Sequence, residues 1–414
     1  MTSERLPAGW LSAKYGDAMI ETDERAGDRM DLPVLSVTKT RGPMLASERF
    51  GKALHTRDVS RYRVARRDVI VADPMLLWDG SIGIQRVVDA GLVSPDYRVY
   101  APSGRTDPAF LAYVVRSPTM LPHYQGGARG TNVRRNRIAR GDFLSIPLAL
   151  PPLPEQRKIA AILSCMDDAI ETTQAVIDQL GVLKKATMAE LLMRGMPGRH
   201  ARFKQTEIGE VPERWDVLPL GALANIGNGS TPSKARPDYW NQGVVPWLPT
   251  GKVNDRIIVQ AEEFVTQKAL AECAIRLLPK GTILVAMIGQ GKTRGKVAYL
   301  GIEATINQNF AYVRPGDRLS SWFLFAYLDH TYETLRAGGR GSNQDALSCG
   351  LMKQYPTPVP PLDEQVGIAD AMLALEARAT AESATLGALA KVKSALMSVL
   401  LTGEVRVKPD EEAA

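Results

Sequence analysis

The sequence predicts an α+β protein in which two homologous globular domains are separated by two long antiparallel coiled-coil helices, with approximate two-fold symmetry. Three observations predict this fold. A Pro-Pro-Leu-x-Glu-Gln motif occurs at 151–156 and again at 360–365, with five of its six residues shared. Each copy begins a long segment with helical periodicity. Each copy also follows short strand-like and helix-like runs, which are typical of an α+β domain.

The segment after the first motif has the spacing of a coiled-coil seam. Apolar or small residues recur every three or four positions from Ile159 to Thr187, as in helices that pair along their length. Pro154 suits the first helical turn, where its missing amide would be unpaired, and Glu155 favours the positive end of the helix. Met-Pro-Gly at 196–198 then ends the helix.

The second long segment keeps the same phase, although Arg378 and Glu382 interrupt its middle. About 40 residues at 1.5 Å each would make either helix roughly 60 Å long. Two unrelated surface helices would not share an opening motif, so duplication is the favoured interpretation. The residues expected to pack between the helices are Ile159, Ile162, Met166, Leu180, Leu183, Ile368, Leu375, Leu389, Val392 and Leu396.

The repeat extends beyond the helices. Pro-x-x-Trp occurs at 7–10 and at 212–215, and each tryptophan is followed six residues later by a glycine. A Gly-x-Arg-Gly-Thr/Ser-Asn loop occurs at 127–132 and at 338–343. The distance between copies grows only from 205 to 211 residues along the chain. Two modules have therefore diverged from one, in the order globular, helix, globular, helix.

Short runs indicate where each globular domain lies. The strand-like runs are 68–72, 97–100, 282–286, 296–300 and 310–313, and the helical patterns are 108–116 and 321–335. We predict globular domains at 1–150 and 198–358, spacer helices at 151–197 and 359–404, and a disordered tail at 405–414.

Connectivity predicts the direction of the helices. The first helix delivers the chain to the second globular domain, so the second helix can pack along the first only by running back. The pair is then antiparallel, and an approximate two-fold axis relates the modules. A two-fold protein with a globular head at each end matches a DNA duplex that is read at two half-sites.

Composition narrows the class of protein. The net charge of +6 and the pI near 9.1 favour an acidic partner such as nucleic acid. From charge alone, the odds that the protein binds nucleic acid are about even. No apolar run is long enough for a membrane span and the N-terminus has no signal-peptide core, so we expect a cytoplasmic protein. Three scattered cysteines and four histidines show no disulfide or zinc spacing, so no metal is expected.

Two clusters of arginine are candidate DNA contacts. Residues 129–140 hold five arginines, two asparagines and no acid, and these side chains match phosphate oxygens and base edges. Residues 61–67 are also basic but alternate like a strand. For this second cluster, DNA contact and protection of a sheet edge fit equally well.

A third basic stretch resembles a phosphate loop. Residues 286–293 read Ala-Met-Ile-Gly-Gln-Gly-Lys-Thr and follow a predicted strand. A nucleotide-binding loop would continue into a helix, whereas 294–300 read as a turn and another strand. A basic turn that points Lys292, Arg294 and Lys296 at DNA is therefore favoured over ATP binding.

Catalytic motifs are absent from the sequence. It has no Asn-Pro-Pro-Tyr or Asp-Pro-Pro-Tyr for base methylation, no FxGxG loop for S-adenosylmethionine, no nuclease ExK triplet and no GxSxG. The chain is therefore expected to recognise a ligand rather than to catalyse a reaction. A self-contained nuclease or NTPase, and a coiled-coil scaffold with no DNA role, stay open as alternatives.

Together these features resemble the specificity subunit, HsdS, of type I restriction-modification systems. The resemblance rests on the two helix-opening motifs, the two Pro-x-x-Trp motifs, and residues 281–286, 291–298 and 306–309 of the second module. It implies that each globular part is a target recognition domain that reads one half of an asymmetric, bipartite sequence in double-stranded DNA.

The resemblance also implies the partners. The chain itself would be non-catalytic and bind no cofactor. Its helices would act as spacer and as docking surface for two methyltransferase subunits, which methylate adenine with S-adenosylmethionine. The complete prokaryotic complex adds restriction subunits that use ATP and Mg²⁺.

The first module departs from this pattern. Asp-Pro-Met-Leu-Leu-Trp at 73–78 stands where the second module has its Gly-Lys turn, and Val-Ser-Pro-Asp at 93–96 stands near the place of 306–309. The candidate DNA-binding residues are Arg61, Arg63, Arg66, Arg67, Arg129, Asn132, Arg134, Arg135, Arg137, Lys252, Gln290, Lys292, Thr293, Arg294, Lys296, Asn307, Gln308, Arg340 and Asn343.

Overall fold

The computed structural model describes residues 6–29, 31–51, 58–129, 137–289, 292–338 and 347–409. The chain forms two compact units, and both long helices are shared between them. The first unit is Met1–Gln174 with Ala384–Ala414, and the second is Ala175–Ser383. Each unit therefore contains one globular head and part of each long helix.

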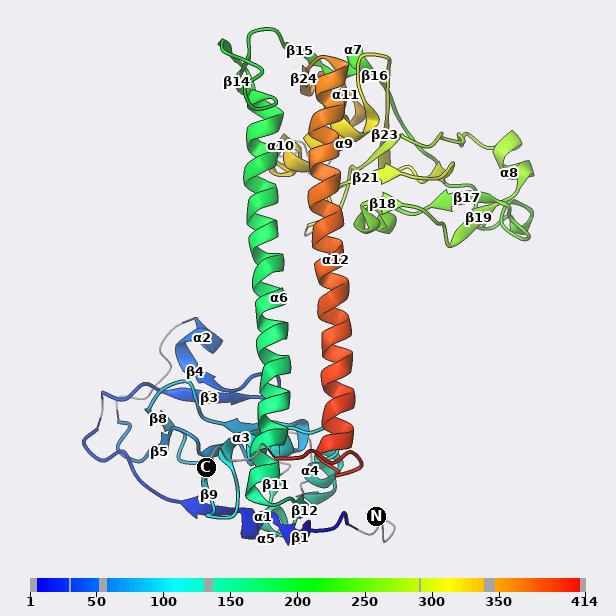
Figure 1. Cartoon of the computed structure of the whole chain (residues 1–414). Coiled ribbons are helices and arrows are strands. Elements are labelled where there is room, and N and C mark those ends of the chain that lie inside the picture. Colours follow the sequence, from blue (N-terminus) through cyan, green and yellow to red (C-terminus); the bar gives the residue numbers. More distant parts are fainter. Residues whose placement is uncertain are drawn as a thin grey trace. The chain divides into compact units, whose positions relative to one another are not determined.

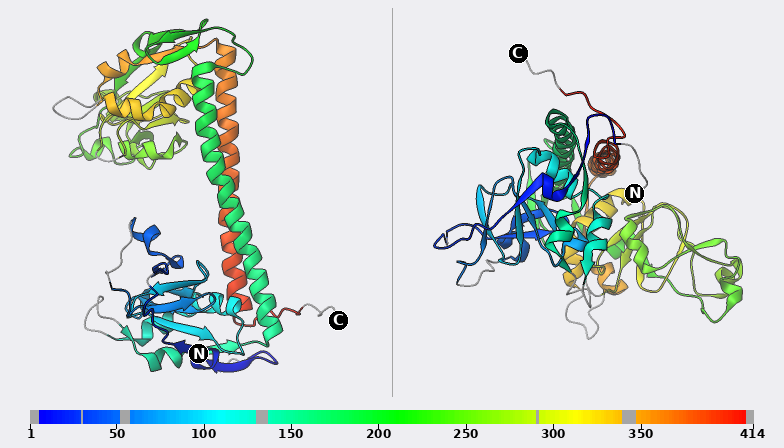
Figure 2. Two further views of the ribbon diagram at one scale, coloured as in Figure 1. Left: turned by 90° about the vertical axis from the view of Figure 1, so that its left-hand side faces the viewer. Right: turned by 90° about the horizontal axis from the view of Figure 1, so that it is seen from below.

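The two long helices are α6 (Leu153–Arg194) and α12 (Leu362–Leu400), which lie side by side in Figures 1 and 2. In the first unit, Ile159 of α6 shares a buried cluster with Leu400 of α12. In the second unit, Leu192 of α6 shares one with Ile368 of α12. An early stretch of one helix thus packs on a late stretch of the other, which confirms the antiparallel pair.

The first head runs from β1 to β12 (Figure 1) and is built on a four-stranded antiparallel sheet. Its strands are, in sheet order, β2 (Met19–Thr22), β9 (Arg98–Pro102), β6 (Ile70–Ala72) and β7 (Ile82–Ile84). Two-stranded sheets add β3 (Leu35–Thr38) with β4 (Gly42–Leu45), β5 (Arg63–Arg66) with β8 (Ala90–Val93), and β10 (Ala128–Arg129) with β11 (Arg137–Ile138).

The second head, from β13 to β24, repeats these four strands and adds a fifth. Its sheet order is β16 (Ala224–Asn228), β23 (Phe310–Pro315), β20 (Ile283–Ala286), β21 (Val297–Leu300) and β18 (Ile257–Ile258), which is parallel to β21. A second sheet has the order β19 (Glu263–Val265), β17 (Val245–Leu248) and β22 (Thr305–Ile306). A hairpin of β13 (Phe203–Thr206) and β14 (Gly209–Pro212) precedes them.

Each head closes on itself just before its long helix. In the first, β1 (Leu11–Lys14) pairs with β12 (Pro147–Leu150), and in the second, β15 (Asp216–Pro219) pairs with β24 (Pro356–Val359). The short helices of the two heads are α1 (Tyr15–Ala18), α2 (Ala46–Phe50), η1 (Leu77–Asp79), α3 (Pro108–Val115), α4 (Leu121–Gly127), α5 (Arg140–Leu144), α7 (Leu220–Leu223), η3 (Pro237–Tyr239), η4 (Thr250–Asp255), α8 (Gln267–Glu272), α9 (Ser321–His330), α10 (Tyr332–Gly338) and α11 (Cys349–Gln354).

Local sequence explains where the main head helix starts in the first unit. Asp107 accepts hydrogen bonds from the backbone amides of Ala109 and Phe110, and Pro108 occupies the first turn, where it needs no partner. Phe110 is fully buried among the aromatic residues Tyr15, Tyr124 and Phe143. The capped helix therefore delivers its apolar face directly into the core of the head.

The predicted helix seam is wrong at two equivalent positions. Leu183 is 51% exposed and Val392 is 49% exposed, although both were expected to pack between the helices. The next residue in each case, Lys184 and Lys393, faces the other helix and forms an ion pair there. At these two positions the residue in the seam lies one place later than predicted, and it is a charged side chain in an ion pair rather than an apolar one.

None of the helices that the structure describes is long and apolar enough to cross a membrane. The tail, expected to be disordered over 405–414, is described as far as Pro409, and Arg406 binds Glu155 there.

Candidate nucleic-acid interface and its attachment to the helices

The glutamate of each duplicated motif binds the tryptophan of the same unit. Trp10 Nε1 donates to Glu155 Oε2 at 3.1 Å, and Trp215 Nε1 donates to Glu364 Oε2 at 3.1 Å. Both glutamates are buried, at 2% and 0% exposure. The two motifs that repeat in the sequence therefore contact each other in each unit, and the contact fastens the segment before β1 or β15 to the start of a long helix.

The glutamine of each motif binds the main helix of the head. Gln156 Oε1 accepts from the amide of Asp107, the residue that caps α3, at 2.8 Å. Gln365 Oε1 accepts from the amide of Ser320, which precedes α9, at 2.7 Å. The side-chain Nε2 of each glutamine donates to a carbonyl two residues before that amide. The start of each long helix is thus bound to the start of a head helix.

The end of the other long helix completes each joint. Arg406, after α12, donates to both oxygens of Glu155 at 2.7 and 2.9 Å. Burial alone would raise the pKa of Glu155, but Arg406 and Trp10 hold this pKa below its ordinary value. In the second unit, Glu364 Oε1 accepts from the Met196 amide at 2.9 Å and contacts His200 Nε2 at 2.8 Å, both after α6.

A pair of glycines marks where the long helices end at these joints. Gly195 has φ +79° and Gly403 has φ +78°, a left-handed conformation that favours glycine. A Cβ on Gly195 would lie 2.5 Å from Glu364, and a Cβ on Gly403 would lie 2.6 Å from Pro7. Both backbones are pressed against the joint, so a larger residue would push it apart.

Charged residues inside the helix seam are also duplicated. Lys184 of α6 pairs with Glu376 of α12 in the second unit, and Lys393 of α12 pairs with Asp167 of α6 in the first. The offset of 209 residues between Glu155 and Glu364 also relates Asp167 to Glu376 and Lys184 to Lys393. One pair is therefore the other with the helices exchanged, and a search for charges at this offset could have found both.

Each head contacts the carboxylate of its own pair. In the first unit, Tyr113 of α3 donates to Asp167 at 2.8 Å, and burial together with Asp167 raises the pKa of Tyr113. In the second unit, Arg256 donates to Glu376 at 2.7 Å and makes two bonds of 2.9 Å to Asp329 of α9. Sequence reasoning missed these residues because their partners lie far away along the chain.

Several loops of the second head converge through backbone hydrogen bonds. Ser230 N donates to Ile306 O at 3.0 Å, Asn307 N donates to Leu248 O at 3.2 Å, and Met287 N donates to Asn309 O at 2.9 Å. We call the resulting surface, formed by 229–234, 249–255, 287–289, 292–296 and 307–309, the loop face of the second head. It contains the predicted residues Lys252, Lys292, Thr293, Arg294, Lys296, Asn307 and Gln308.

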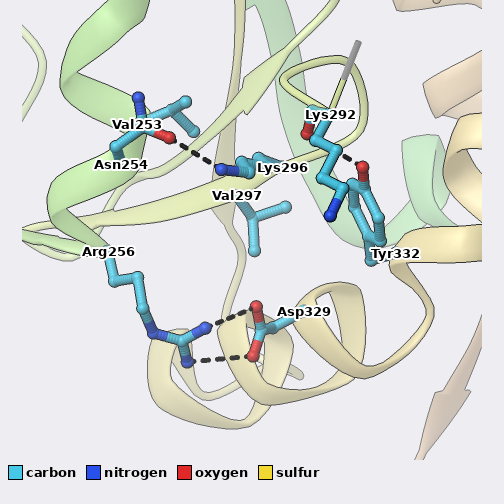
Figure 3. A pocket seen from close by; sticks show the side chains of 8 residues that line it. All are labelled: Val253, Asn254, Arg256, Lys292, Lys296, Val297, Asp329 and Tyr332. Atoms are coloured by element: carbon cyan, nitrogen blue, oxygen red, sulfur yellow. Dashed lines mark hydrogen bonds and ion pairs between the residues drawn. The ribbon is translucent and has the colours of Figure 1, made fainter. Parts of the chain in front are cut away.

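A pocket of about 320 Å³ opens on this face. Its lining residues, shown in Figure 3, are Val253, Asn254, Arg256, Lys292, Lys296, Val297, Asp329 and Tyr332. Lys296 Nζ donates to the side-chain carbonyl of Asn254 at 2.7 Å, and the Tyr332 hydroxyl donates to the Lys292 carbonyl at 2.8 Å. Arg256 is already paired with Asp329 and Glu376, so Lys292 and Lys296 are the lining cations that suit a phosphate group.

The described part of the turn before β21, residues 292–296, leads into a strand rather than a helix. After Lys292 the chain turns, and it enters β21 at Val297, which pairs with Val285 of β20. No helix starts in the described turn 292–296, so backbone amides at a helix N-terminus are not available there to bind a phosphate chain. DNA contact by this basic turn stays a prediction.

Two predicted residues of the loop face are already engaged within the head. Asn307 is buried, and its side-chain oxygen accepts from the Thr250 hydroxyl at 3.0 Å and from the Asn309 amide at 3.2 Å. Lys252 is also buried and pairs with Asp255 and Glu262. Lys292 and Gln308, in contrast, are exposed.

The predicted arginines of the first head are largely paired with acids. Arg66 makes two hydrogen bonds to Glu24, at 2.8 and 3.0 Å, and Arg66 and Arg29 hold the pKa of Glu24 below its ordinary value. Arg63 pairs with Glu21 and Asp23, Arg67 pairs with Asp89, and Arg61 is exposed. DNA contact by Arg63, Arg66 or Arg67 would have to exchange these ion pairs, and it stays a prediction.

Of the remaining predicted residues, the structure describes Arg129 and Arg137. Arg129 of β10 lies opposite Arg137 of β11 in the sheet register. Asn132, Arg134, Arg135, Gln290, Arg340 and Asn343 lie outside the described residues. No group of histidine, cysteine, aspartate and glutamate residues in the described part could hold a metal ion.

Comparisons with known proteins agree with this architecture. A family model described as the type I restriction modification DNA specificity domain matches residues 29–181 and 212–389. The type I restriction enzyme MjaVIII specificity subunit of Methanocaldococcus jannaschii is 25% identical over 421 residues, 98% of this chain and 95% of that protein.

Solved structures of similar fold cover the chain almost completely. The HsdS subunit from Thermoanaerobacter tengcongensis has a TM-score of 0.50 at 18% identity, over 98% of this chain and 99% of that one. A chain from a study of complex assembly in a type I R-M system has a TM-score of 0.61 at 17% identity, over 97% and 100%.

Proposed function

Since the chain belongs to the type I restriction modification DNA specificity family, we propose that each of its heads reads one half of a bipartite, asymmetric DNA target. As a DNA specificity subunit, the chain is the non-catalytic component of a type I restriction-modification enzyme. The resemblance inferred from the sequence is thereby confirmed. The two-headed reading of a split target is the proposal.

The observation that carries this proposal is the duplication of the joints. Glu155 and Glu364 fasten the two heads to the helix pair in the same way, so both heads are presented on equivalent supports. The turn between the central strands differs, because the first head has η1 (Leu77–Asp79) where the second has Lys292 and Lys296. Equivalent supports with different loops favour two different half-sites.

We further propose that two methyltransferase subunits dock on the helix pair and supply the catalysis. The helices carry equivalent exposed positions, since Leu183 and Val392 are 209 residues apart and both exposed. A duplicated surface suits two copies of one partner. S-adenosylmethionine would then bind those subunits, and ATP and Mg²⁺ would bind the restriction subunits of the full complex.

DNA contact in the second head is proposed at the loop face. Lys292 and Lys296 line the pocket of Figure 3 and would hold a backbone phosphate. Gln308, which is exposed on another loop of this face, would contact a base edge. Phosphate contacts position a protein on DNA, and base-edge contacts determine the sequence it selects. The loop face offers both kinds of group.

Exchange of a head tests the proposal. The chain is co-expressed with its methyltransferase partner, and methylated adenines are mapped by sequencing. Replacing residues 20–145 with those of another such subunit should change one half of the motif and leave the other half and the gap intact. A change in both halves would contradict independent reading. Calorimetric binding of S-adenosylmethionine by the isolated chain would contradict the proposed division of labour.

A further inference from the structure

Two neighbouring amides on the loop face of the second head have opposite environments. Asn307 is 8% exposed, and its oxygen accepts two hydrogen bonds from within the head. Gln308 is exposed, and its Oε1 accepts a single bond of 2.5 Å from the Thr231 hydroxyl. Within the described residues, no group accepts a hydrogen bond from Gln308 Nε2. Asn307 therefore shapes the loop, and Gln308 presents an amide to whatever lies above it.

The backbone beneath Gln308 and Thr231 is tightly packed. A Cβ on Gly229 would lie 2.1 Å from the carbonyl oxygen of Ile306, a distance that no side chain could occupy. Ser230 N also donates to this carbonyl at 3.0 Å. The two segments thus touch backbone to backbone, which keeps the Thr231 hydroxyl within reach of the glutamine.

Tryptophans hold the Thr231 segment from the other side. Trp247 Nε1 donates to Ser230 O at 3.3 Å and Trp240 Nε1 donates to Ser233 O at 3.1 Å. Lys234 Nζ lies 3.6 Å from the centre of the Trp240 ring and pairs with Glu263 at 2.8 Å. These contacts hold the backbone that carries Thr231, so less of it has to be ordered on binding.

We propose that Gln308, oriented by Thr231, reads an adenine in the half-site of the second head. A glutamine amide accepts from adenine N6 and donates to adenine N7 in the major groove. Gln308 has both groups available, since an amide oxygen can accept a second bond beside the one from Thr231. This inference rests on the proposed function and identifies one specificity-determining residue within it.

Two substitutions at Gln308 make different predictions. Gln308→Met keeps the length but loses both hydrogen bonds, so one base pair of the second half-site should become degenerate. Gln308→Glu can only accept, and an acceptor fits the N4 amino group of cytosine; that position should shift toward C·G. Thr231→Val should weaken the same discrimination in part. Glu303→Gln, an exposed change in the same head, is the matched control and should leave the motif unchanged.

The measurement is the methylated motif of cells that carry each variant with the methyltransferase partner. Where a variant complex methylates nothing, binding of the purified complex is compared on duplexes that differ by one A·T to G·C change in the second half-site. Loss of the glutamine should reduce discrimination at one position by about tenfold to a hundredfold.

The outcomes distinguish failure of the role of Gln308 from failure of the proposed function. Unchanged discrimination at every position in Gln308→Met and Gln308→Glu, or a change in the first half-site, would overturn the role of Gln308. Failure of the proposed function would appear in the wild-type complex, as a motif that is not bipartite, whatever happens at residue 308.

Discussion

The joints between head and helix are alike in the two units, whereas the loops between the central strands of the two heads differ. Trp10, Glu155 and Gln156 make the same contacts as Trp215, Glu364 and Gln365. Between β6 and β7 the first head has a 3-10 turn in which Asp79 pairs with Lys39, whereas the corresponding turn of the second head exposes Lys292. Attachment tolerates little change because its partners are buried, and solvent-facing loops are free to diverge.

The joints also differ from each other in one respect. Glu155 binds Arg406, whose side chain is 41% exposed, at 2.7 Å. Glu364 binds the Met196 amide and His200, whose side chain is 6% exposed, and its exposed arginine, Arg199, lies farther away, at 3.7 Å. Water can therefore reach the third partner in the first joint, and it is largely excluded from the histidine of the second. The second joint is the one that depends more on its carboxylate.

Removing that carboxylate should have the largest effect. Glu364→Ala leaves the Trp215 indole and the Met196 amide without an acceptor, and each buried unsatisfied donor costs about 1–3 kcal/mol. We expect a loss of roughly 3 kcal/mol or more in the second unit. Glu155→Ala should cost about half as much in the first unit, because Arg406 can be solvated. Peptide-level hydrogen exchange in the full chain measures each unit separately.

The exposed Glu213→Ala is the control for these variants and should be nearly neutral. Equal losses in Glu155→Ala and Glu364→Ala would show that exposure of the third partner does not matter.

The two interhelical ion pairs should differ by a smaller amount. The Lys184 and Glu376 side chains are 27% and 18% exposed, whereas those of Lys393 and Asp167 are 24% and 41% exposed. A double-mutant cycle with Lys184→Met and Glu376→Gln should give a coupling of about 1 kcal/mol, and one with Lys393→Met and Asp167→Asn should give less. A larger coupling for the more exposed pair would refute this ordering.

The ion pair between Lys184 and Glu376 should also make the stability of the protein depend on pH. Burial would raise the pKa of Glu376, but Lys184 and Arg256 hold this pKa below its ordinary value. Because the folded pKa is depressed, the stabilisation is present above the ordinary glutamate pKa of about 4.3 and is lost as pH falls through the folded pKa. Unfolding of wild type should therefore become easier at acid pH, and Glu376→Gln should remove part of this dependence.

The smallest expected effect is the loss of DNA affinity when a single lysine is replaced. Lys292→Ala should weaken binding similarly for all sequences and reduce the slope of log affinity against log salt by about one. Lys39→Ala should change the slope less, because Lys39 already pairs with Asp79 at 3.3 Å. Titrations of the complex at several salt concentrations measure both slopes. ATP binding by wild type that Lys292→Ala abolishes would instead favour the phosphate loop.

The sequence by itself determined the parts of this protein that depend on local pattern. The seven-residue periodicity and the repeated opening motif predicted both long helices, because the apolar seam of a helix is formed by residues three and four positions apart in the sequence. Duplication plus connectivity predicted their antiparallel direction. The same repeats indicated that Pro-x-x-Trp and the Glu-Gln pair matter, although nothing local showed that they bind each other.

Only the tertiary structure decided which distant residues meet. Lys184 replaces Leu183 in the seam because Glu376, 192 residues later, lies opposite it, and no window of local sequence contains both. The sequence alone likewise could not distinguish the roles of Asn307 and Gln308, because both are side-chain amides and they are adjacent in the chain. Thr250 and Thr231, from two other loops, bind one each. Burial and hydrogen bonding depend on how loops pack in space, and packing is a property of the whole fold.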